Sequence, residues 1–200
     1  IKIRIFPETG PTCVFGSDYT GEAKKSFLRL AMYQTKRRGG LGLHAGSKRV
    51  YLGRGDSVQT VGQLFLGLSA TGKTTLTCHD FGLTPPEEAE MVQDDVCNLL
   101  PNGIAAGTEG RGLYIKTIGL SPNNHPDLYR AATQSETVLE NVVVDADGSV
   151  DFANDAHTAN SRATVRRDHL EHASMDIDLD RVDRALFLTR NPVIQPIPRL

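Results

Sequence analysis

The stretch GLSATGKTTLT, residues 67–77, decides how the rest of the chain is interpreted. It fits the G-x-x-x-x-G-K-[ST] spacing of a loop that binds nucleotide phosphates through backbone N–H groups. In such loops the lysine contacts the β- and γ-phosphates, and the hydroxyl after it ligates Mg²⁺. The alternative is a glycine- and serine-rich turn with an exposed lysine. The pattern predicts nucleotide contacts from Gly67, Leu68, Ser69, Ala70, Thr71, Gly72, Lys73, Thr74 and Thr75.

An apolar run precedes this loop and a pair of carboxylates follows it. VGQLFLGL at 61–68 leads directly into the loop, which is the strand, loop and helix order that the motif requires. EMVQDD at 90–95 predicts an apolar strand that ends in Asp94 and Asp95. Two adjacent carboxylates repel each other, and a divalent cation relieves this repulsion. The sequence therefore predicts a metal–nucleotide site, with a solvated Asp-Asp turn as the alternative.

Composition excludes few classes of protein. The chain has 200 residues and a net charge of −2, so it has no overall attraction to nucleic acid or to anionic membranes. No apolar run approaches the ~18 residues of a membrane span. The 3 cysteines have no C-x-x-C spacing and indicate reduced thiols. We therefore expect a cytoplasmic protein with no nucleic-acid and no membrane partner.

Periodicity predicts many strands and few helices. An apolar stripe of Ala23, Phe27, Leu30, Ala31 and Gln34 predicts a helix over 21–37. A second helix is expected over 125–134, a hairpin around Asp147-Gly148 in 140–152, and an exposed insertion over 78–90. Further strands are expected at 1–6, 41–45, 49–53, 61–68, 90–95, 112–120 and 185–190. The expected fold is a strand-rich, mixed-sheet α/β nucleotide-binding domain with a P-loop, not a simple doubly wound parallel sheet.

Several blocks of sequence in one order extend this interpretation. They are SDYTGEAKKSF (17–27), GLHAGS (42–47), GLSATGKTTLT (67–77), VQDD (92–95), YIKTIGLS (114–121), ETVLENVVVDADGSVDF (136–152), ANSRA (159–163) and LTRNPVIQPIPRL (188–200). From about Ser17 to Leu200 the chain resembles ATP-dependent phosphoenolpyruvate carboxykinase. The resemblance implies decarboxylation and phosphorylation of oxaloacetate by ATP, with Mg²⁺ on the nucleotide and Mn²⁺ at the substrate. GTP-using relatives carry a cysteine in the loop, and residues 67–74 contain none.

The resemblance also assigns roles to single residues. It implies that Lys25, His44 and Asp95 ligate Mn²⁺ and that Thr74 ligates Mg²⁺. Such a lysine binds a metal only as the neutral amine, and the N/O set suits Mn²⁺. The resemblance implies substrate contacts from Tyr19, Lys25 and Arg162, nucleotide contacts from Lys73, Lys116 and Arg162, and catalytic roles for Lys25, Arg162, Asp94 and Asp95. The alternatives are a solvated Lys25, a core or edge His44, and an Arg162 in a surface ion pair.

The resemblance also suggests how the chain is divided. Residues 1–60 would carry substrate-metal ligands at the end of an N-terminal domain and the start of the catalytic domain. Residues 61–200 would form the P-loop catalytic domain, incomplete at its C-terminus, so these 200 residues alone are expected to be inactive. Ala70 stands where members commonly have glycine, and His125 where they have a glutamate near the nucleotide. The alternative functions are another P-loop phosphotransferase, such as an HPr-kinase-like protein, or a non-catalytic ATP-binding module; the oligomeric state is left open.

Overall fold

A computed structural model describes residues 1–54, 57–68 and 71–190. The helices are α1 (Thr20–Arg37), α2 (Lys73–Cys78) and α3 (Pro126–Ala132), and a 3₁₀ turn covers Arg167–His169. The strands are β1 (Lys2–Ile5), β2 (Thr12–Phe15), β3 (Leu41–Leu43), β4 (Ala45–Arg54), β5 (Ser57–Gly67), β6 (Glu88–Gln93), β7 (Cys97–Leu99), β8 (Ala105–Gly107), β9 (Gly112–Lys116), β10 (Val138–Glu140), β11 (Val143–Val144), β12 (Val150–Asp151), β13 (Arg162–Arg166) and β14 (Arg184–Leu188).

The largest sheet has four strands in the order β14-β5-β4-β6. β4 runs antiparallel to both β5 and β6, whereas β14 runs parallel to β5, with Arg184 opposite Gln63 and Leu188 opposite Gly67. The sheet is therefore mixed, and the prediction of a strand-rich α/β fold that is not a simple doubly wound sheet is confirmed.

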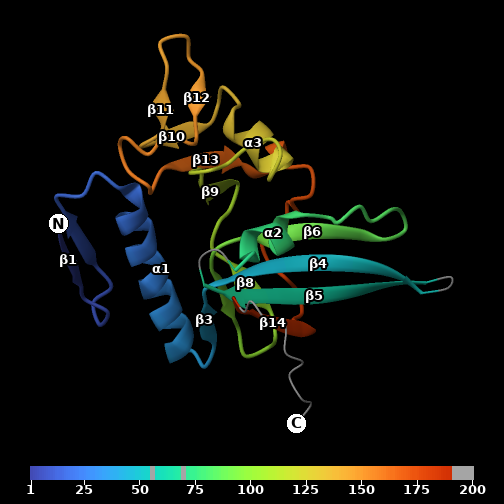
Figure 1. The fold of residues 1–200 in the computed structure, drawn as a ribbon. Helices are drawn as coiled ribbons and strands as arrows, with labels where there is room; N and C mark the ends of the chain where they lie inside the picture. Colours follow the sequence, from blue (N-terminus) through green and yellow to red (C-terminus); the bar gives the residue numbers. More distant parts are fainter. Residues whose placement is uncertain (55–56, 69–70, 191–200) are drawn as a thin grey trace.

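Smaller sheets surround it (Figure 1). The sheet β10-β13-β9 lies above the four-stranded sheet together with α3, and the β11–β12 hairpin projects from it. The sheet β3-β7-β8 lies at one end of β4 and β5, and α1 runs along the same side of the molecule next to the β1–β2 hairpin. Each sheet except the four-stranded one is purely antiparallel.

Two apolar cores follow from this arrangement. The upper core lies between β9, β13 and α3 and contains Met91, Leu113, Ile115, Leu120, Leu128, Ala131, Ala132, Phe152, Ala163, Val165 and Leu170. The lower core contains Ala45, Leu64, Val92, Cys97, Ala105 and Leu179. β6 contributes Met91 to the upper core and the adjacent Val92 to the lower one, because successive side chains of a strand point to opposite faces. The end of β6 therefore lies where the two cores meet.

Helix α1 forms over the predicted range but buries a different face. The predicted stripe is wrong, because Phe27 is 66% exposed. The buried positions include Gly21, Leu28 and Thr35, seven residues apart, and Lys24 lies on the same side. Lys24 can face inward because it meets two carboxylates there. A prediction based on apolar spacing places lysine on the exposed side of a helix, and therefore misses the buried face that contains Lys24.

Other elements agree with the sequence in part. The strand expected at 49–53 forms the second half of the longer β4. The strand expected over 112–120 ends at Lys116, and a turn with φ +75° at Gly119 follows it. The hairpin around Asp147-Gly148 is confirmed as β11–β12, although Leu139 and Glu140 belong to β10 and pair with β13. The range 78–90 is exposed only at residues 81–82, 84–86 and 88, because Cys78 ends α2 and the last residues enter β6. The sequence did not predict β2, β7, β8, β10 or β13.

No helix in the described ranges combines the length and the apolar character needed to cross a bilayer.

Candidate active site

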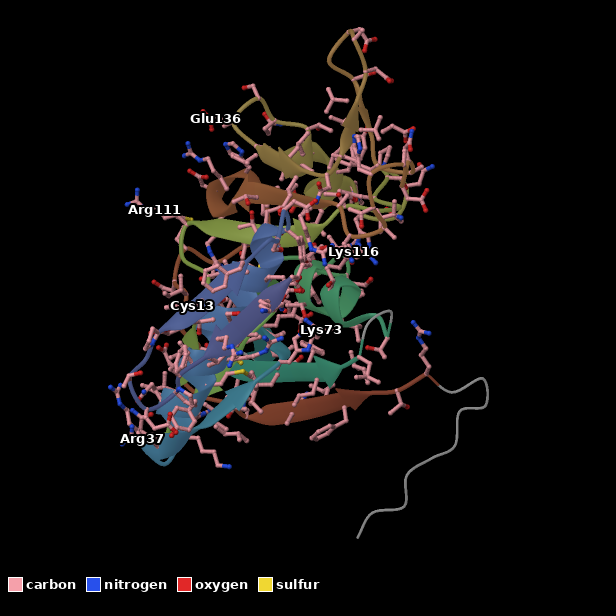
Figure 2. All side chains as sticks on the ribbon, turned by 90° about the vertical axis from the view of Figure 1, so that its left-hand side faces the viewer. Cys13, Arg37, Lys73, Arg111, Lys116 and Glu136 are labelled. Carbon is pink, nitrogen blue, oxygen red and sulfur yellow. The ribbon has the colours of Figure 1, made fainter. Side chains whose placement is uncertain are left out.

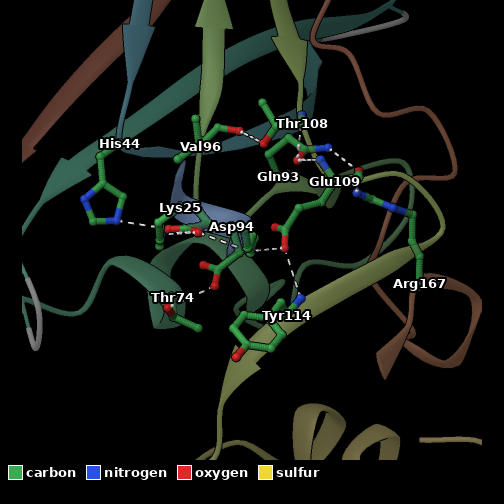
Figure 3. Close-up of polar contacts among 12 residues, drawn as sticks. Lys25, His44, Thr74, Gln93, Asp94, Val96, Thr108, Glu109, Tyr114 and Arg167 are labelled. Atoms are coloured by element: carbon green, nitrogen blue, oxygen red, sulfur yellow. Dashed lines mark hydrogen bonds and ion pairs between the residues drawn. The ribbon is translucent and has the colours of Figure 1, made fainter. Parts of the chain in front are cut away.

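Asp95 is the carboxylate on which the predicted metal-binding side chains converge. It follows β6, and its side chain is 16% exposed. Its Oδ2 accepts hydrogen bonds from Lys25 Nζ at 2.5 Å and from Lys24 Nζ at 3.2 Å. His44 Nε2 lies 3.1 Å from Oδ1. Figure 3 shows His44 and Lys25 directed toward the same point. The structure therefore brings together Lys25, His44 and Asp95 from distant parts of the chain.

Local pairing explains why His44 reaches Asp95. β3 ends at Leu43, which is the register partner of Cys97 in β7, and β4 begins at Ala45 in a different sheet. His44 lies at the point where the chain changes sheets. Because β3 and β7 are antiparallel, the residue after Leu43 lies near the residues that precede Cys97, which include Asp95.

The charges around Asp95 reinforce one another. Burial disfavours ionisation of Asp95, but hydrogen bonds from His44 and Lys25 and the charges of Lys24 and Lys25 outweigh it, so the pKa of Asp95 lies well below its ordinary value. Burial also disfavours the charged form of Lys24, but Glu109 and Asp95 outweigh this effect and raise the pKa of Lys24. Asp95 is therefore an anion, and Lys24 a cation, at neutral pH.

The connection from β5 to α2 contains the predicted phosphate loop. Leu68 is 81% exposed, and its carbonyl accepts a hydrogen bond from the Thr71 hydroxyl at 2.8 Å. Gly72 precedes α2 with φ +88°, a left-handed conformation that favours glycine. The strand, loop and helix follow in the predicted order, with Thr74 and Thr75 in the first turn of α2. Ser69 and Ala70 lie outside the described residues.

Asp94 links this loop to the carboxylate pair. The Thr74 hydroxyl donates to Asp94 Oδ2 at 3.3 Å, and Lys73 Nζ donates to the Asp94 backbone carbonyl. Asp94 Oδ1 is buried and has no hydrogen-bond partner within the part of the chain that the structure describes. A buried carboxylate oxygen without a partner needs an explanation, and binding of a cation would be one. The carboxylate and hydroxyl oxygens of Asp94 and Thr74 fit Mg²⁺, which prefers oxygen ligands.

The set around Asp95 fits a different metal. An amine, an imidazole and a carboxylate form a mixed nitrogen and oxygen set, which suits a first-row transition metal such as Mn²⁺. Within residues 1–54, 57–68 and 71–190, no group of three or more His, Cys, Asp or Glu side chains has the geometry of a metal site. A metal at Asp95 would therefore depend on the Lys25 amine as a ligand.

Arg162 packs against two neighbouring tyrosine rings, whose centres are 6.5 Å apart. Its guanidinium carbon lies 5.5 Å from the centre of the Tyr19 ring and 5.9 Å from the centre of the Tyr114 ring. Each such contact contributes about 0.5–1 kcal/mol at an exposed site. Gly21 leaves room for this arrangement, because a Cβ there would lie 2.1 Å from the Tyr19 ring. Arg162 is thus held by these ring contacts and by a hydrogen bond from its Nη1 to Ser161 O at 2.9 Å, and it forms no ion pair with any residue that the structure describes.

Lys116 is the cross-strand partner of Arg162. The two residues are opposite each other in the pairing of β9 with β13, so their side chains leave the sheet on the same face. Lys116 is exposed, and Figure 2 labels it on the upper part of the molecule, with Lys73 on α2 below it. The predicted nucleotide lysine thus lies next to the predicted phosphate arginine.

The structure adds residues that the sequence did not single out. Glu109, with a side chain 7% exposed, accepts a hydrogen bond from Lys24 Nζ at 2.7 Å and one from the Tyr114 backbone N–H at 3.0 Å. Tyr114 donates its hydroxyl to Glu140 and lies beneath Arg162. Glu109 stands in the segment GTEGRG, which has no motif that would distinguish it. Only its contact with Lys24 identifies it.

His125 lies in a separate pocket between α2 and α3. The pocket has a volume of about 300 Å³, and its lining includes His79, Asp80, His125 and His172, the four residues that we call the histidine pocket. His125 precedes α3, and its ring centre lies 5.8 Å from that of His79. Burial and the charge of His79 lower the pKa of His125.

Comparisons with known proteins give a consistent result. A model of the phosphoenolpyruvate carboxykinase family matches residues 2–200. The chain is 45% identical over 193 residues to a phosphoenolpyruvate carboxykinase (ATP) from Aeropyrum pernix, covering 94% of this chain and 38% of that protein. It is 35% identical over 191 residues to the phosphoenolpyruvate carboxykinase (ATP) of Thermus thermophilus, a match that covers 94% of this chain and 33% of that protein. It is 32% identical over 188 residues to the phosphoenolpyruvate carboxykinase (ATP) of Ruegeria pomeroyi, a match that covers 92% of this chain and 33% of that protein.

The chain thus spans roughly a third of the length of these relatives. The matched region includes the loop at 67–77, the carboxylates at 94–95 and the strand that begins at Arg162. On this match, the chain belongs to the ATP-dependent phosphoenolpyruvate carboxykinase family.

Proposed function

We propose that this protein converts oxaloacetate and ATP to phosphoenolpyruvate, ADP and CO₂, the carboxy-lyase step of gluconeogenesis. The observation that carries the proposal is the convergence of Lys25 and His44 on Asp95 beside the Asp94–Thr74 contact. A phosphate loop alone is common to many nucleotide-binding proteins. A lysine, an imidazole and a carboxylate meeting next to that loop are what a decarboxylating phosphotransferase requires.

Two cation positions are part of the proposal. Lys25, His44 and Asp95 would hold Mn²⁺, and Thr74 with Asp94 would hold the Mg²⁺ of ATP. When bound, these ions supply positive charge close to the oxygens on which negative charge develops. Lys24 and Lys25 both contact Asp95, and Lys25 would bind Mn²⁺ through its amine nitrogen.

The remaining residues would handle the phosphates and the substrate. Loss of CO₂ breaks a carbon–carbon bond and leaves an enolate, whose oxygen attacks the γ-phosphorus of ATP while ADP leaves. Lys73 and the amides of residues 67–75 would hold the phosphates. Arg162, supported by the Tyr19 and Tyr114 rings, would spread the charge of the transferring phosphoryl group. Tyr19 would contact the substrate, and Lys116 the nucleotide.

The extent of the chain bears on this proposal. We propose that residues 1–60 contribute substrate-metal ligands and that residues 61–200 form the P-loop catalytic domain. Since the relatives are about three times as long, we expect the 200 residues alone to bind nucleotide weakly and to have no turnover. The cytoplasmic location stays a prediction.

The test is an assay of the full-length protein with oxaloacetate, ATP, Mg²⁺ and Mn²⁺. We expect phosphoenolpyruvate and ADP in equal amounts, with the product lost in an Asp95→Asn variant and absent from the isolated 200 residues. ATP binding without oxaloacetate-dependent ADP formation in the full-length protein would contradict the proposal and favour a non-catalytic ATP-binding module. Phosphorylation of a protein serine would instead favour an HPr-kinase-like enzyme. The family match does not favour either alternative.

A further inference from the structure

Arg167 is a completely buried arginine close to the proposed active site. It follows β13 and is 0% exposed. Its Nε donates to Gly110 O at 2.9 Å, and its Nη2 donates to Glu109 O at 3.0 Å. Its Nη1 donates to Val92 O at 2.8 Å and to Ser174 O at 3.0 Å. The guanidinium therefore joins separate backbone segments through carbonyl oxygens.

Two of the segments that Arg167 joins, those of Val92 and Glu109, carry or adjoin residues of the site. Val92 is two positions before Asp94 in the strand that leads to the carboxylate pair. Glu109 accepts the hydrogen bond from Lys24, which in turn contacts Asp95. Arg167 itself lies just after β13, the strand that begins with Arg162. The Arg167 side chain thus connects the segment of Asp94 and Asp95, the segment of Glu109, and strand β13, which begins with Arg162.

Gln93 adds a second connection to the same segment. It is completely buried, and its Nε2 donates to Glu109 O at 2.9 Å. Its Oε1 accepts from the Glu109 N–H at 3.0 Å and from the Thr108 N–H at 3.3 Å. Glu109 O therefore accepts hydrogen bonds from both Arg167 and Gln93, as Figure 3 shows. The backbone of the loop that carries Glu109 is therefore fixed to the end of β6. The Glu109 carboxylate takes no part in these bonds and contacts Lys24 instead.

The chemistry of arginine explains the choice of residue. Burying a guanidinium is costly unless its donors are satisfied, and an apolar replacement would leave the carbonyl oxygens that it meets without this donor. The planar fork of donors also fixes the direction and spacing of the carbonyls that it meets. A lysine would keep the charge but lose the fork. The arrangement favours a role in geometry over a role in stability alone.

We propose that Arg167 is a positioning residue, which sets the distance between the Asp94–Asp95 pair and Arg162 through the Val92 and Glu109 carbonyls. Its side chain is completely buried, so it would act through the residues that face the nucleotide and the substrate. The inference rests on the proposed function and names a residue that supports its geometry.

Variants at Arg167 and its neighbour in the full-length protein test this role. Arg166 is 53% exposed and pairs with Asp168 and Glu136, so Arg166→Met is the matched control. For Arg167→Met we expect the Kd for Mn²⁺ to rise, and kcat to fall, by about 10- to 100-fold, as for residues that support metal ligands. The KM for ATP should stay within about twofold, because the phosphate loop has no contact with Arg167 among the described residues. Arg167→Lys should give intermediate values, and Arg166→Met should change none of them.

Each outcome decides the proposal. A lower melting temperature with unchanged Mn²⁺ affinity and kcat per folded molecule would show a purely structural role and overturn it. If Arg167→Met does not fold, Arg167→Lys is judged by the same criteria. Amide hydrogen exchange separates this test from that of the proposed function. Faster exchange at residues 92–95 and 107–111 in Arg167→Lys, but not in Arg166→Met, supports the positioning role even if the protein forms no phosphoenolpyruvate, and equal exchange overturns it.

Discussion

The surroundings of Asp95 and the histidine pocket contain similar side chains in different arrangements. At Asp95, two lysines and His44 lie within 3.2 Å of one carboxylate. In the histidine pocket, His172 Nε2 lies 3.7 Å from Asp80 Oδ2, and the rings of His79 and His125 face each other at 5.8 Å. The same residue types thus occur in two different arrangements. Of the two regions, the one around Asp95 is where several side chains meet at one partly buried carboxylate.

The largest difference is expected when the acid of each region is neutralised. In the full-length protein, Asp95→Asn should lower kcat/KM for oxaloacetate by about a thousandfold, or about 4 kcal/mol, because the charge that gathers Lys25 and His44 is lost. The matched Asp80→Asn should change it by less than about threefold. Steady-state formation of phosphoenolpyruvate measures both, and equal losses would remove the distinction between the two regions.

Replacing one histidine in each region should show which of the two regions binds a cation. We expect His44→Asn to weaken Mn²⁺ binding by at least about tenfold, because an imidazole donor is lost. His79→Asn should leave the affinity within about twofold, since the His79 ring faces His125 and not Asp95. Calorimetric titration with Mn²⁺ is the measurement. Weaker binding in His79→Asn alone would move the cation site to the histidine pocket.

The two regions should also respond to pH in different ranges. The pKa of His125 in the folded protein lies below its ordinary value of about 6.5. As the pH falls through about 6.5, the unfolded chain therefore binds more protons at His125 than the folded chain does, and the free energy of unfolding decreases. Asp95 has a depressed pKa, so its contribution is present above about pH 3.9 and is lost only in stronger acid.

Melting curves at a series of pH values test this difference. Between pH 7.5 and 5.5, His125→Gln should lose roughly 1–2 °C less than the wild type, whereas Asp95→Asn should have the wild-type slope. Below about pH 4 the order should reverse, with the flatter curve in Asp95→Asn. A wild-type slope for His125→Gln near neutral pH would show that the His125 imidazole is not held neutral by its surroundings.

The smallest effect concerns the thiols of the two regions. Burial raises the pKa of the Cys97 thiol, near Asp95, to about 12. Cys78 lines the histidine pocket, and burial together with the charge of Asp94 raises the pKa of its thiol well above the usual value. Thiolates react and thiols do not. We expect iodoacetamide at pH 8 to modify neither in the folded protein, as measured by peptide mass spectrometry. Fast modification of Cys78 alone would indicate that the pocket opens to solvent.

Much of the candidate site could be predicted from the sequence because it depends on contiguous motifs. The order of strand, loop and helix at 61–78 and the position of Asp94 and Asp95 after β6 follow from local pattern. The convergence of Lys25 and His44 on Asp95 came from the family resemblance, because nothing in the local pattern relates these three positions. The roles of these residues stay proposals.

What the sequence could not predict depends on contacts between distant segments. Glu109 and Arg167 have no motif, and their importance appears only when β6, the 107–111 loop and β13 lie together. The inward face of α1 was mispredicted because Lys24 is balanced by Glu109 and Asp95, partners far away in the chain. Short strands such as β7 and β8 carry too few residues for a periodic signal.

The position of β14 has a consequence for how the protein is made. β14 is the parallel neighbour of β5, the strand that ends at the phosphate loop, although β5 ends at Gly67 and β14 begins only at Arg184. Until Arg184–Leu188 has left the ribosome, one side of β5 presents unpaired backbone groups, a template for association with other chains. The segment that completes this sheet is thus synthesised long after β5, and a nascent chain arrested between the two strands would need a chaperone to shield that edge.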